Sequence, residues 1–312
     1  MVLPTKNDLQ QAYQRVQLHV HRTPVLTSRL INEYSGSSIY FKCENFQKMG
    51  AFKMRGAVNA ILQVDNKEKG VVTHSSGNFA QALALAAKNL GVKAYIVMPE
   101  NAPSVKKEAV LSYGGIITES ESTLASREAE AARIVNETGA TFLHPSNNTS
   151  VLLGQGTSAI ELLEAHPDLD HIFVPVGGGG LIAGTALATS YFGVDCTTIG
   201  GEPSLVDDAY RSLLSGQIET NKNTQTIADG LRTNLGDRNF PIIKELVGEI
   251  IRVDEDEIIR AMKLLWERLK IVIEPSSAVA FAALVKEKKR FKDKKIGIIL
   301  SGGNVDLGSL PF

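Results

Sequence analysis

Residues 174–184 read Val-Pro-Val-Gly-Gly-Gly-Gly-Leu-Ile-Ala-Gly, which is a short β-rich run, four consecutive glycines and the start of a helical run. A strand that enters a helix through a glycine turn is the repeating unit of parallel α/β folds. A tight turn alone needs one or two glycines, whereas four allow several backbone N–H groups to converge beside a helix N-terminus. The stretch therefore predicts an α/β fold with a phosphate-type anion cradle at Gly177, Gly178, Gly179 and Gly180.

The rest of the chain alternates in the same way. Apolar residues have helical spacing in residues 9–16, 79–90 and 258–269, and the last of these follows a capping box made by Asp254 and Glu257. Short β-rich runs lie between the helical patterns, at residues 71–73, 94–98, 141–143, 172–176, 197–199 and 296–300. This alternation predicts open parallel sheets covered by helices, with ligands gathered beyond the carboxyl ends of the strands.

The bulk composition excludes several classes of protein. The 312 residues are 43% hydrophobic and 21% charged, with a formal net charge of -1, so a nucleic-acid partner is not expected. No apolar stretch approaches the ~20 residues of a membrane helix, and the N-terminus has no secretory signal pattern. Two isolated cysteines, Cys43 and Cys196, fit a reduced, cytoplasmic protein.

The glycine run also has a second interpretation. Gly178, Gly180 and Ala183 satisfy the pattern G-x-G-x-x-A, and Glu202 lies near the end of the next strand pattern. This arrangement resembles a dinucleotide fingerprint and keeps a dinucleotide-dependent oxidoreductase open as an alternative, although a lone match of this kind is weak.

A lysine follows an aromatic residue in residues 42–57, Lys-Cys-Glu-Asn-Phe-Gln-Lys-Met-Gly-Ala-Phe-Lys-Met-Arg-Gly-Ala. Lys53 stands at the start of a helical run, directly after Phe52. A lysine at a helix N-terminus beside a desolvating ring has a lowered pKa and can form a Schiff base. For a lone lysine, a solvated surface position is the commoner interpretation. A catalytic role for Lys53 therefore depends on the segments around it.

Two further loops follow strand patterns. Residues 74–81, His-Ser-Ser-Gly-Asn-Phe-Ala-Gln, offer hydroxyls, an amide and free N–H groups at a helix start, which suit a substrate carboxylate or a simple N-cap. Residues 301–306, Ser-Gly-Gly-Asn-Val-Asp, form another strand-to-glycine turn.

Taken in order, these segments resemble the fold type II pyridoxal phosphate (PLP) enzymes, whose fold is the tryptophan synthase beta-like type. The resemblance is carried by FQKMGAFKMRGA around Lys53, SSGN from Ser75, VGGGGLIAG from Val176, EPSS from Glu274 and SGGN from Ser301. Within this family the chain is most similar to the threonine/serine dehydratase and serine racemase branch, over nearly its whole length. KCENFQKMGAFKMRGA and SGGNVD are the most specific segments.

The resemblance implies a PLP site. Lys53 would hold the cofactor as a Schiff base and act as the base at the substrate Cα. The other cofactor-binding residues implied are Phe52 beside the ring, Asn78 at the ring hydroxyl, Gly177 to Gly180 at the phosphate, Glu274, and Ser301 at the pyridine nitrogen.

Substrate residues follow from the same resemblance. Ser76 would face the substrate on the side opposite Lys53, and an acid–base group on each face permits racemisation as well as elimination. The residues that match carboxylate-binding positions are Ser75, Ser76, Asn78, Arg127 and Thr233. Arg127 is equally well interpreted as a solvated helix residue.

Glu202, the carbonyl of Val206 and Asp208 match the divalent metal site of this branch. Two carboxylates and a carbonyl suit Mg²⁺ or Ca²⁺, with Mn²⁺ a further option, although both acids could be ordinary surface charges.

The chain departs from the branch at two places. Phe79 stands where a histidine usually follows SSGN, which disfavours a dicarboxylate substrate. Arg29 and Met49 replace hydroxyl residues used in nucleotide activation, which argues against ATP regulation.

We therefore expect two α/β domains and a homodimer. Residues 1–45 and 145–312 would form a large cofactor-binding domain, and residues 46–144 a small mobile domain that carries the substrate loop. The expected function is a PLP-dependent L-threonine/L-serine dehydratase that yields a 2-keto acid and ammonia. Serine racemase with side dehydratase activity and threo-3-hydroxyaspartate dehydratase are the alternatives within the branch.

Overall fold

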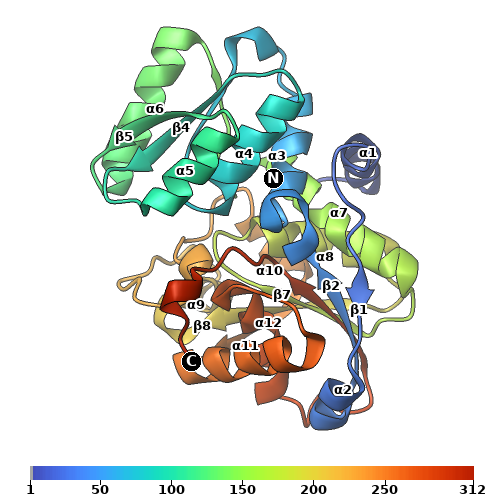
Figure 1. Ribbon diagram of the computed structural model, residues 1–312. Coiled ribbons are helices and arrows are strands. Elements are labelled where there is room, and N and C mark those ends of the chain that lie inside the picture. The colour runs from blue at the N-terminus through green and yellow to red at the C-terminus, as the bar shows by residue number, and fades with distance from the viewer. Residues whose placement is uncertain (1–2) are drawn as a thin grey trace.

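The computed structural model of the chain describes residues 3–312. Met1 and Val2, which fall within the predicted large domain, lie outside the described residues. Two separate sheets form, one of six strands and one of four, and helices cover both (Figure 1). The prediction of an α/β fold with two parallel-sheet domains is confirmed.

The larger sheet has the strand order β1-β2-β10-β7-β8-β9. Only the edge strand β1 runs antiparallel to its neighbour, and the other adjacent strands are parallel. Its central strands are buried on both faces, as expected when helices cover both sides of a sheet. The strands are β1 (Val25–Leu26), β2 (Ser38–Cys43), β7 (His171–Pro175), β8 (Thr197–Pro203), β9 (Val247–Val253) and β10 (Lys295–Leu300).

Helices form a layer on each face of this sheet. One layer consists of α1, α7, α8 and α10, and the other of α2, α11 and α12. The apolar residues of each layer pack into a separate core cluster. The capping box that the sequence predicts at Asp254 and Glu257 begins α11. The bounds are α1 (Lys6–Val16), α2 (Arg29–Ser35), α7 (Thr149–Ala165), α8 (Gly180–Phe192), α9 (Asp208–Ser215), α10 (Phe240–Leu246), α11 (Glu255–Leu269) and α12 (Pro275–Lys286).

The smaller sheet is entirely parallel and has the order β5-β4-β3-β6. Helices α3, α4 and α5 cover one face and α6 covers the other. The elements are α3 (Lys53–Leu62), β3 (Val71–His74), α4 (Asn78–Asn89), β4 (Ala94–Pro99), α5 (Ser104–Ser112), β5 (Ile116–Ser120), α6 (Leu124–Thr138) and β6 (Thr141–Phe142).

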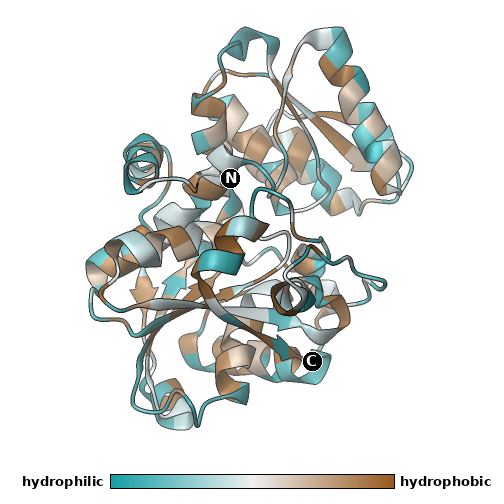
Figure 2. Ribbon diagram, turned by 180° about the vertical axis from the view of Figure 1, so that it is seen from behind, coloured by the Kyte–Doolittle hydropathy of each residue, from teal (hydrophilic) through white to brown (hydrophobic). Residues whose placement is uncertain are grey.

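The chain leaves the larger sheet after β2 and returns to it through α7, so the smaller sheet is an insertion (Figure 1). All four of its strands lie inside the predicted range 46–144, while the boundary residues themselves stay a prediction. Figure 2 shows apolar residues concentrated on strands and inward helix faces, with hydrophilic residues on the outer turns. Within residues 3–312, no helix combines the length and the apolar character needed to span a bilayer.

Candidate active site

The loops predicted to bind ligands lie at the carboxyl ends of three strands. β7 ends at Pro175 before the glycine run, and β10 ends at Leu300 before Ser301. These two strands are neighbours in the larger sheet. β3 of the smaller sheet ends at His74, before the loop that contains Ser76. Ligand sites of α/β proteins form at such strand ends, so the three loops are placed to share one site.

Lys53 is the first residue of α3 and has an enclosed amine. Its Nζ donates to the carbonyl of Pro145 at 2.9 Å. The same atom lies 5.0 Å from the centroid of the Phe52 ring and 5.8 Å from that of Phe79. Burial lowers the pKa of Lys53 to about 8, although the negative charge of Glu274 opposes the shift. An amine with a lowered pKa is largely unprotonated at mildly alkaline pH, which is the form that attacks an aldehyde.

Backbone pairing places Lys53 beside the loop after β10. The N–H of Phe52 donates to the carbonyl of Ser301 at 2.9 Å, and the preceding residue forms a bridge with Gly302. Ser301 is buried, and its hydroxyl lies 3.1 Å from that of Ser277. Two predicted cofactor residues from opposite ends of the chain are thereby brought together.

The glycine run fits a phosphate group. Gly179 has φ +79, and a Cβ added to Gly177 would lie 2.8 Å from the Cα of Leu231. Within residues 3–312, the amides of Gly177, Gly178 and Gly179 donate no hydrogen bond, and the first turn of α8 begins at Gly180. Free N–H groups in a close-packed turn at a helix N-terminus are suited to an anion.

Asn239, which no sequence motif indicates, holds this loop through its side-chain amide. Its Nδ2 donates to the carbonyl of Gly178 at 2.6 Å and to that of Ser146 at 3.1 Å. Its Oδ1 is buried and has no partner in the described part of the chain. No motif spacing links Asn239 to the glycines, because its role depends on the packing of α10 against α8.

A second cluster joins the substrate loop to α12. Asn78, the first residue of α4, donates through Nδ2 to both carboxylate oxygens of Glu274, and its Oδ1 accepts a hydrogen bond of 2.8 Å from Asn304. Burial raises the pKa of Glu274 to about 7 despite the hydrogen bond from Asn78. Asn304 was part of the quoted SGGN segment, yet its sequence position alone assigned it no partner.

The predicted substrate residues are placed less uniformly. Ser75 and Ser76 lie on the loop between β3 and α4. The hydroxyl of Thr233 lies beside the glycine run, 3.0 Å from where a Cβ on Gly178 would stand. Arg127 lies on α6 and donates to the carbonyl of Thr123 in its own helix. Among residues 3–312, no hydrogen bond or ion pair joins Arg127 to the other predicted residues.

Glu202, near the end of β8, and Asp208, the first residue of α9, form a separate pair of buried carboxylates. Glu202 accepts from the amides of Ala209 and Tyr210, and Asp208 accepts from the amide of Leu235 at 2.8 Å. Burial and the charge of Asp208 raise the pKa of Glu202 well above its ordinary value, and burial raises the pKa of Asp208 to about 6.

The two acids fit an oxygen-preferring cation. Neither forms a salt bridge in the described chain, whereas the intervening Asp207 pairs with Arg211 and Arg252. Val206 is buried in the same turn and carries the predicted third ligand, its carbonyl. No cluster of three or more His, Cys, Asp or Glu side chains forms a metal site within residues 3–312, so a cation here would rest on two carboxylates and main-chain oxygen.

The dinucleotide interpretation needs Glu202 as the acidic ligand of a ribose. The amides of Ala209 and Tyr210 orient the Glu202 carboxylate toward the first turn of α9, beside Asp208, so it belongs to that buried acidic pair.

Comparisons with known proteins agree with this geometry. A family model described as "Pyridoxal-phosphate dependent enzyme" matches residues 16–302. Serine racemase of Dictyostelium discoideum is 50% identical over 99% of this chain and 98% of its own length. A beta-hydroxyaspartate dehydratase of Paracoccus denitrificans (strain Pd 1222) is 46% identical over 100% of both chains.

A solved structure of maize serine racemase superposes with a TM-score of 0.96 at 46% identity, covering 98% of this chain and 95% of that one. A family match over more than nine-tenths of the sequence, joined to relatives at this identity, leaves one assignment. The chain belongs to the family of pyridoxal-phosphate dependent enzymes.

Proposed function

We propose that the chain uses PLP bound at Lys53 to remove water and ammonia from L-serine or L-threonine, and that the same site racemises serine. The observation that carries the proposal is the enclosed amine of Lys53, with its pKa lowered to about 8, beside Phe52 and the loop of Ser301. The relatives named as serine racemases are the specific reason to include racemisation.

Lys53 and Ser301 would have separate roles in the elimination reaction. Bound PLP would supply an electron sink for the charge left at Cα. Lys53 Nζ would take the Cα proton, and the β-hydroxyl would leave as water after gaining a proton. The released enamine would hydrolyse to a 2-keto acid and ammonia. Ser301 would hold the ring nitrogen of the cofactor with a hydroxyl. A hydroxyl would leave the ring a weaker electron sink than a carboxylate would, which favours prompt elimination.

Ser76 would serve the opposite face of the substrate. A proton delivered there by its hydroxyl inverts the configuration at Cα, whereas a proton returned by Lys53 restores it. A buried divalent cation at Glu202, Asp208 and the Val206 carbonyl would neutralise two like charges and fix the turn before α9.

Threo-3-hydroxyaspartate is the second candidate substrate, favoured by the 46% identical hydroxyaspartate dehydratase. Phe79 argues against it, because this buried ring offers no donor to a second carboxylate. Arg127 bonds to its own helix and supplies none to the described site either.

The test is a substrate panel on the PLP-loaded protein. Keto acid formation is measured from L-serine, L-threonine and threo-3-hydroxyaspartate, and D-serine from L-serine is measured by chiral chromatography. We expect keto acid from the first two, and about a 10²-fold or greater loss of racemisation in Ser76→Ala with most L-serine elimination retained. Dominant turnover of threo-3-hydroxyaspartate, or joint loss of both activities in Ser76→Ala, would contradict the proposal.

A further inference from the structure

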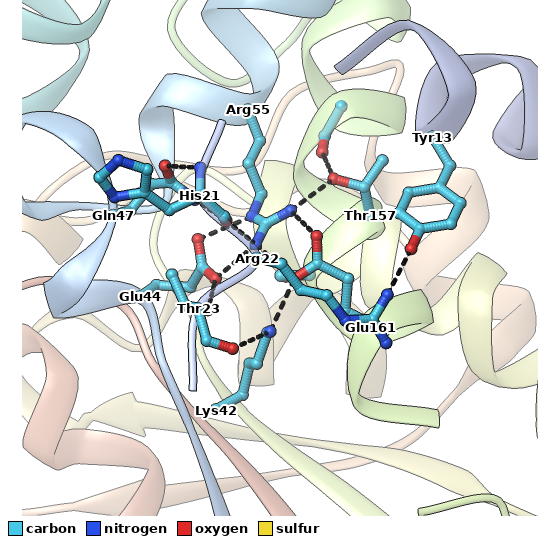
Figure 3. A network of polar contacts seen from close by, with 12 residues as sticks. Tyr13, His21, Arg22, Thr23, Lys42, Glu44, Gln47, Arg55, Thr157 and Glu161 are labelled. Atoms are coloured by element: carbon cyan, nitrogen blue, oxygen red, sulfur yellow. Dashed lines mark hydrogen bonds and ion pairs between the residues drawn. The ribbon is translucent and has the colours of Figure 1, made fainter. Parts of the chain in front are cut away.

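A buried network of charged side chains surrounds Arg55 in the first turn of α3, the helix that begins with Lys53 (Figure 3). It consists of two cations, Lys42 and Arg55, and two carboxylates, Glu44 and Glu161, all at most 2% exposed. Their charges balance within the cluster. Lys42 and Glu44 come from β2 and the turn that follows it, Glu161 comes from α7, and Arg55 comes from the first turn of α3. The network therefore ties the helix that begins with Lys53 to two elements of the larger-sheet domain.

Arg55 is held in a fixed plane by two carboxylates. Its Nε and Nη2 donate to the two oxygens of Glu44 at 2.7 and 2.8 Å. Its Nη1 and Nη2 donate to the two oxygens of Glu161, both at 2.8 Å. A guanidinium that is bidentate to two acids can neither rotate nor slide without breaking several hydrogen bonds at once.

Lys42 and Thr23 supply further hydrogen bonds to the two acids. Lys42 Nζ donates to Glu161 at 2.6 Å and to the carbonyl of Thr23 at 2.7 Å. The hydroxyl of Thr23 donates to Glu44 at 2.6 Å. Burial alone would raise the pKa of Glu44, but the adjacent Arg55 outweighs burial and holds that pKa below its ordinary value. Glu44 therefore stays charged inside the protein.

Stability is a poor explanation for such a cluster. Desolvation offsets most of the attraction within buried ion pairs, and well-packed apolar residues in their place are often equally stable. A network of fixed charges does, however, specify one geometry. In this molecule the network fixes the first turn of α3 relative to β2 and α7.

Lys53 and Arg55 occupy opposite sides of one helical turn. Residues two apart on an α-helix are separated by about 200° around its axis, so their side chains point in nearly opposite directions. Backbone pairing of Ala51 and Phe52 with the Ser301 loop anchors the start of α3 on one side, and Phe52, the N-cap, adds no side-chain hydrogen bond. The guanidinium clamped on the other side of the turn is therefore the side-chain constraint on the rotation of α3, and with it on the direction of the Lys53 amine.

We propose that Arg55, clamped by Glu44 and Glu161, is the positioning residue for Lys53, and this inference rests on the proposed function. Arg55 acts through the first turn of α3 and contacts neither substrate nor cofactor. A misplacement of about 1 Å at a reacting group can reduce turnover ~10²-fold, so loss of the clamp should reduce kcat far more than it raises KM.

The test compares Arg55→Lys with the charge-balanced double variant Arg55→Met/Glu44→Gln. The lysine keeps the charge but cannot bind two carboxylates bidentately. The double variant removes one cation and one anion and leaves Lys42 paired with Glu161. Both are loaded with PLP and assayed for kcat, for KM and for the pH midpoint of the visible absorbance of Lys53-bound cofactor. Urea unfolding is measured in parallel.

Ile31→Ala in α2 is the matched control. Ile31 is fully buried in the larger-sheet core, and α2 lies at the end of the molecule remote from α3 (Figure 1). This truncation lowers stability by opening a cavity, without touching the network. We expect at least a tenfold fall in kcat and a shifted midpoint in both Arg55 variants, with neither change in Ile31→Ala.

Unchanged kcat and midpoint in the Arg55 variants would overturn the inference, as would equal losses in an Ile31→Ala protein of similar stability. Failure of both Arg55 variants to fold would show that the network serves folding and would also reject the positioning role. The proposed function fails separately, if the unmodified protein shows no visible absorbance that Lys53→Ala removes.

Discussion

Lys106 on α5 donates a hydrogen bond of 2.8 Å to the carboxylate of Asp229, which belongs to the larger-sheet part of the chain. Asp229 begins a short 3₁₀ turn that ends at Leu231, the residue whose Cα lies against Gly177 of the glycine run. The ion pair therefore links the inserted domain to the segment that supports the predicted phosphate cradle.

Removing the Lys106–Asp229 ion pair should weaken substrate binding and should change the stability of the fold only slightly. We expect Lys106→Met to raise KM for the amino acid several-fold and to change the free energy of unfolding by at most about 1 kcal/mol, because the pair is partly exposed. Steady-state kinetics at low and high salt measures the effect, which should shrink as screening weakens the pair in the unmodified protein. Lys286→Met is the control, since Lys286 pairs with Glu257 within the larger-sheet domain. Equal KM changes in the two variants would contradict the interpretation.

The pH dependence of cofactor capture should report the pKa of Lys53. Only the unprotonated amine attacks the aldehyde, so the capture rate of the cofactor-free protein should rise with pH and level off above about 8. Stopped-flow absorbance with free PLP measures this rate. A rate that still climbs steeply at pH 10, where an ordinary lysine titrates, would show that burial does not lower the pKa of Lys53.

A methyl group on the glycine run should reduce cofactor affinity. In Gly177→Ala the new Cβ would stand 2.8 Å from the Cα of Leu231, and backbone cannot yield cheaply. We expect PLP affinity to fall about tenfold or more, with a cost of ~1–3 kcal/mol in stability. Gly248→Ala is the matched control, because its Cβ would meet nothing closer than 3.5 Å. Equilibrium titration with PLP measures the affinity of each variant. Equal affinity in both variants would show that the glycine run does not bind the phosphate.

A divalent cation should stabilise the protein through Glu202 and Asp208. At about 100 times Kd, Mg²⁺ or Ca²⁺ should contribute ~2.7 kcal/mol and raise Tm by about 5 °C. The double variant Glu202→Gln/Asp208→Asn should lose this shift. Asp207→Asn should keep it, because the Asp207 carboxylate already pairs with Arg211 and Arg252. Differential scanning calorimetry measures the shift, and its survival in the double variant would place the cation elsewhere.

The sequence predicted the elements whose patterns are local. Each of the six β-rich runs overlaps a strand, with Leu143 and Val176 one residue beyond β6 and β7, and the capping box at Asp254 begins a helix. It did not predict β2, because that strand contains Lys42, a charge that is buried only through Glu161 on α7. It also missed β9, where Glu249 and Arg252 interrupt the apolar pattern of an edge strand.

The candidate site shows the same division. Motif order identified Lys53, Ser301 and the glycine run. The structure pairs the Lys53 segment with the Ser301 loop, and Pro145, which accepts from Lys53, precedes Ser146, which lies against Gly178. Arg55 was quoted within the Lys53 segment without a role, because its two acids lie on different elements and no spacing pairs them. Asn239 was absent from the prediction for the same reason. Residues that become partners only through tertiary packing have no regular spacing in the sequence, so a single sequence does not reveal them.

The strand order of the larger sheet also bears on how the chain is made. β10, the last strand, pairs with β2 along six residues from Ser38 to Cys43 and joins it to β7. A ribosome therefore exposes β2 and β7 long before the strand that separates them emerges, while residues 71–142 can already pair among themselves. The insertion should consequently fold during translation, and the larger sheet should close only once β10 has been made, with its slow long-range pairings prone to aggregation until then.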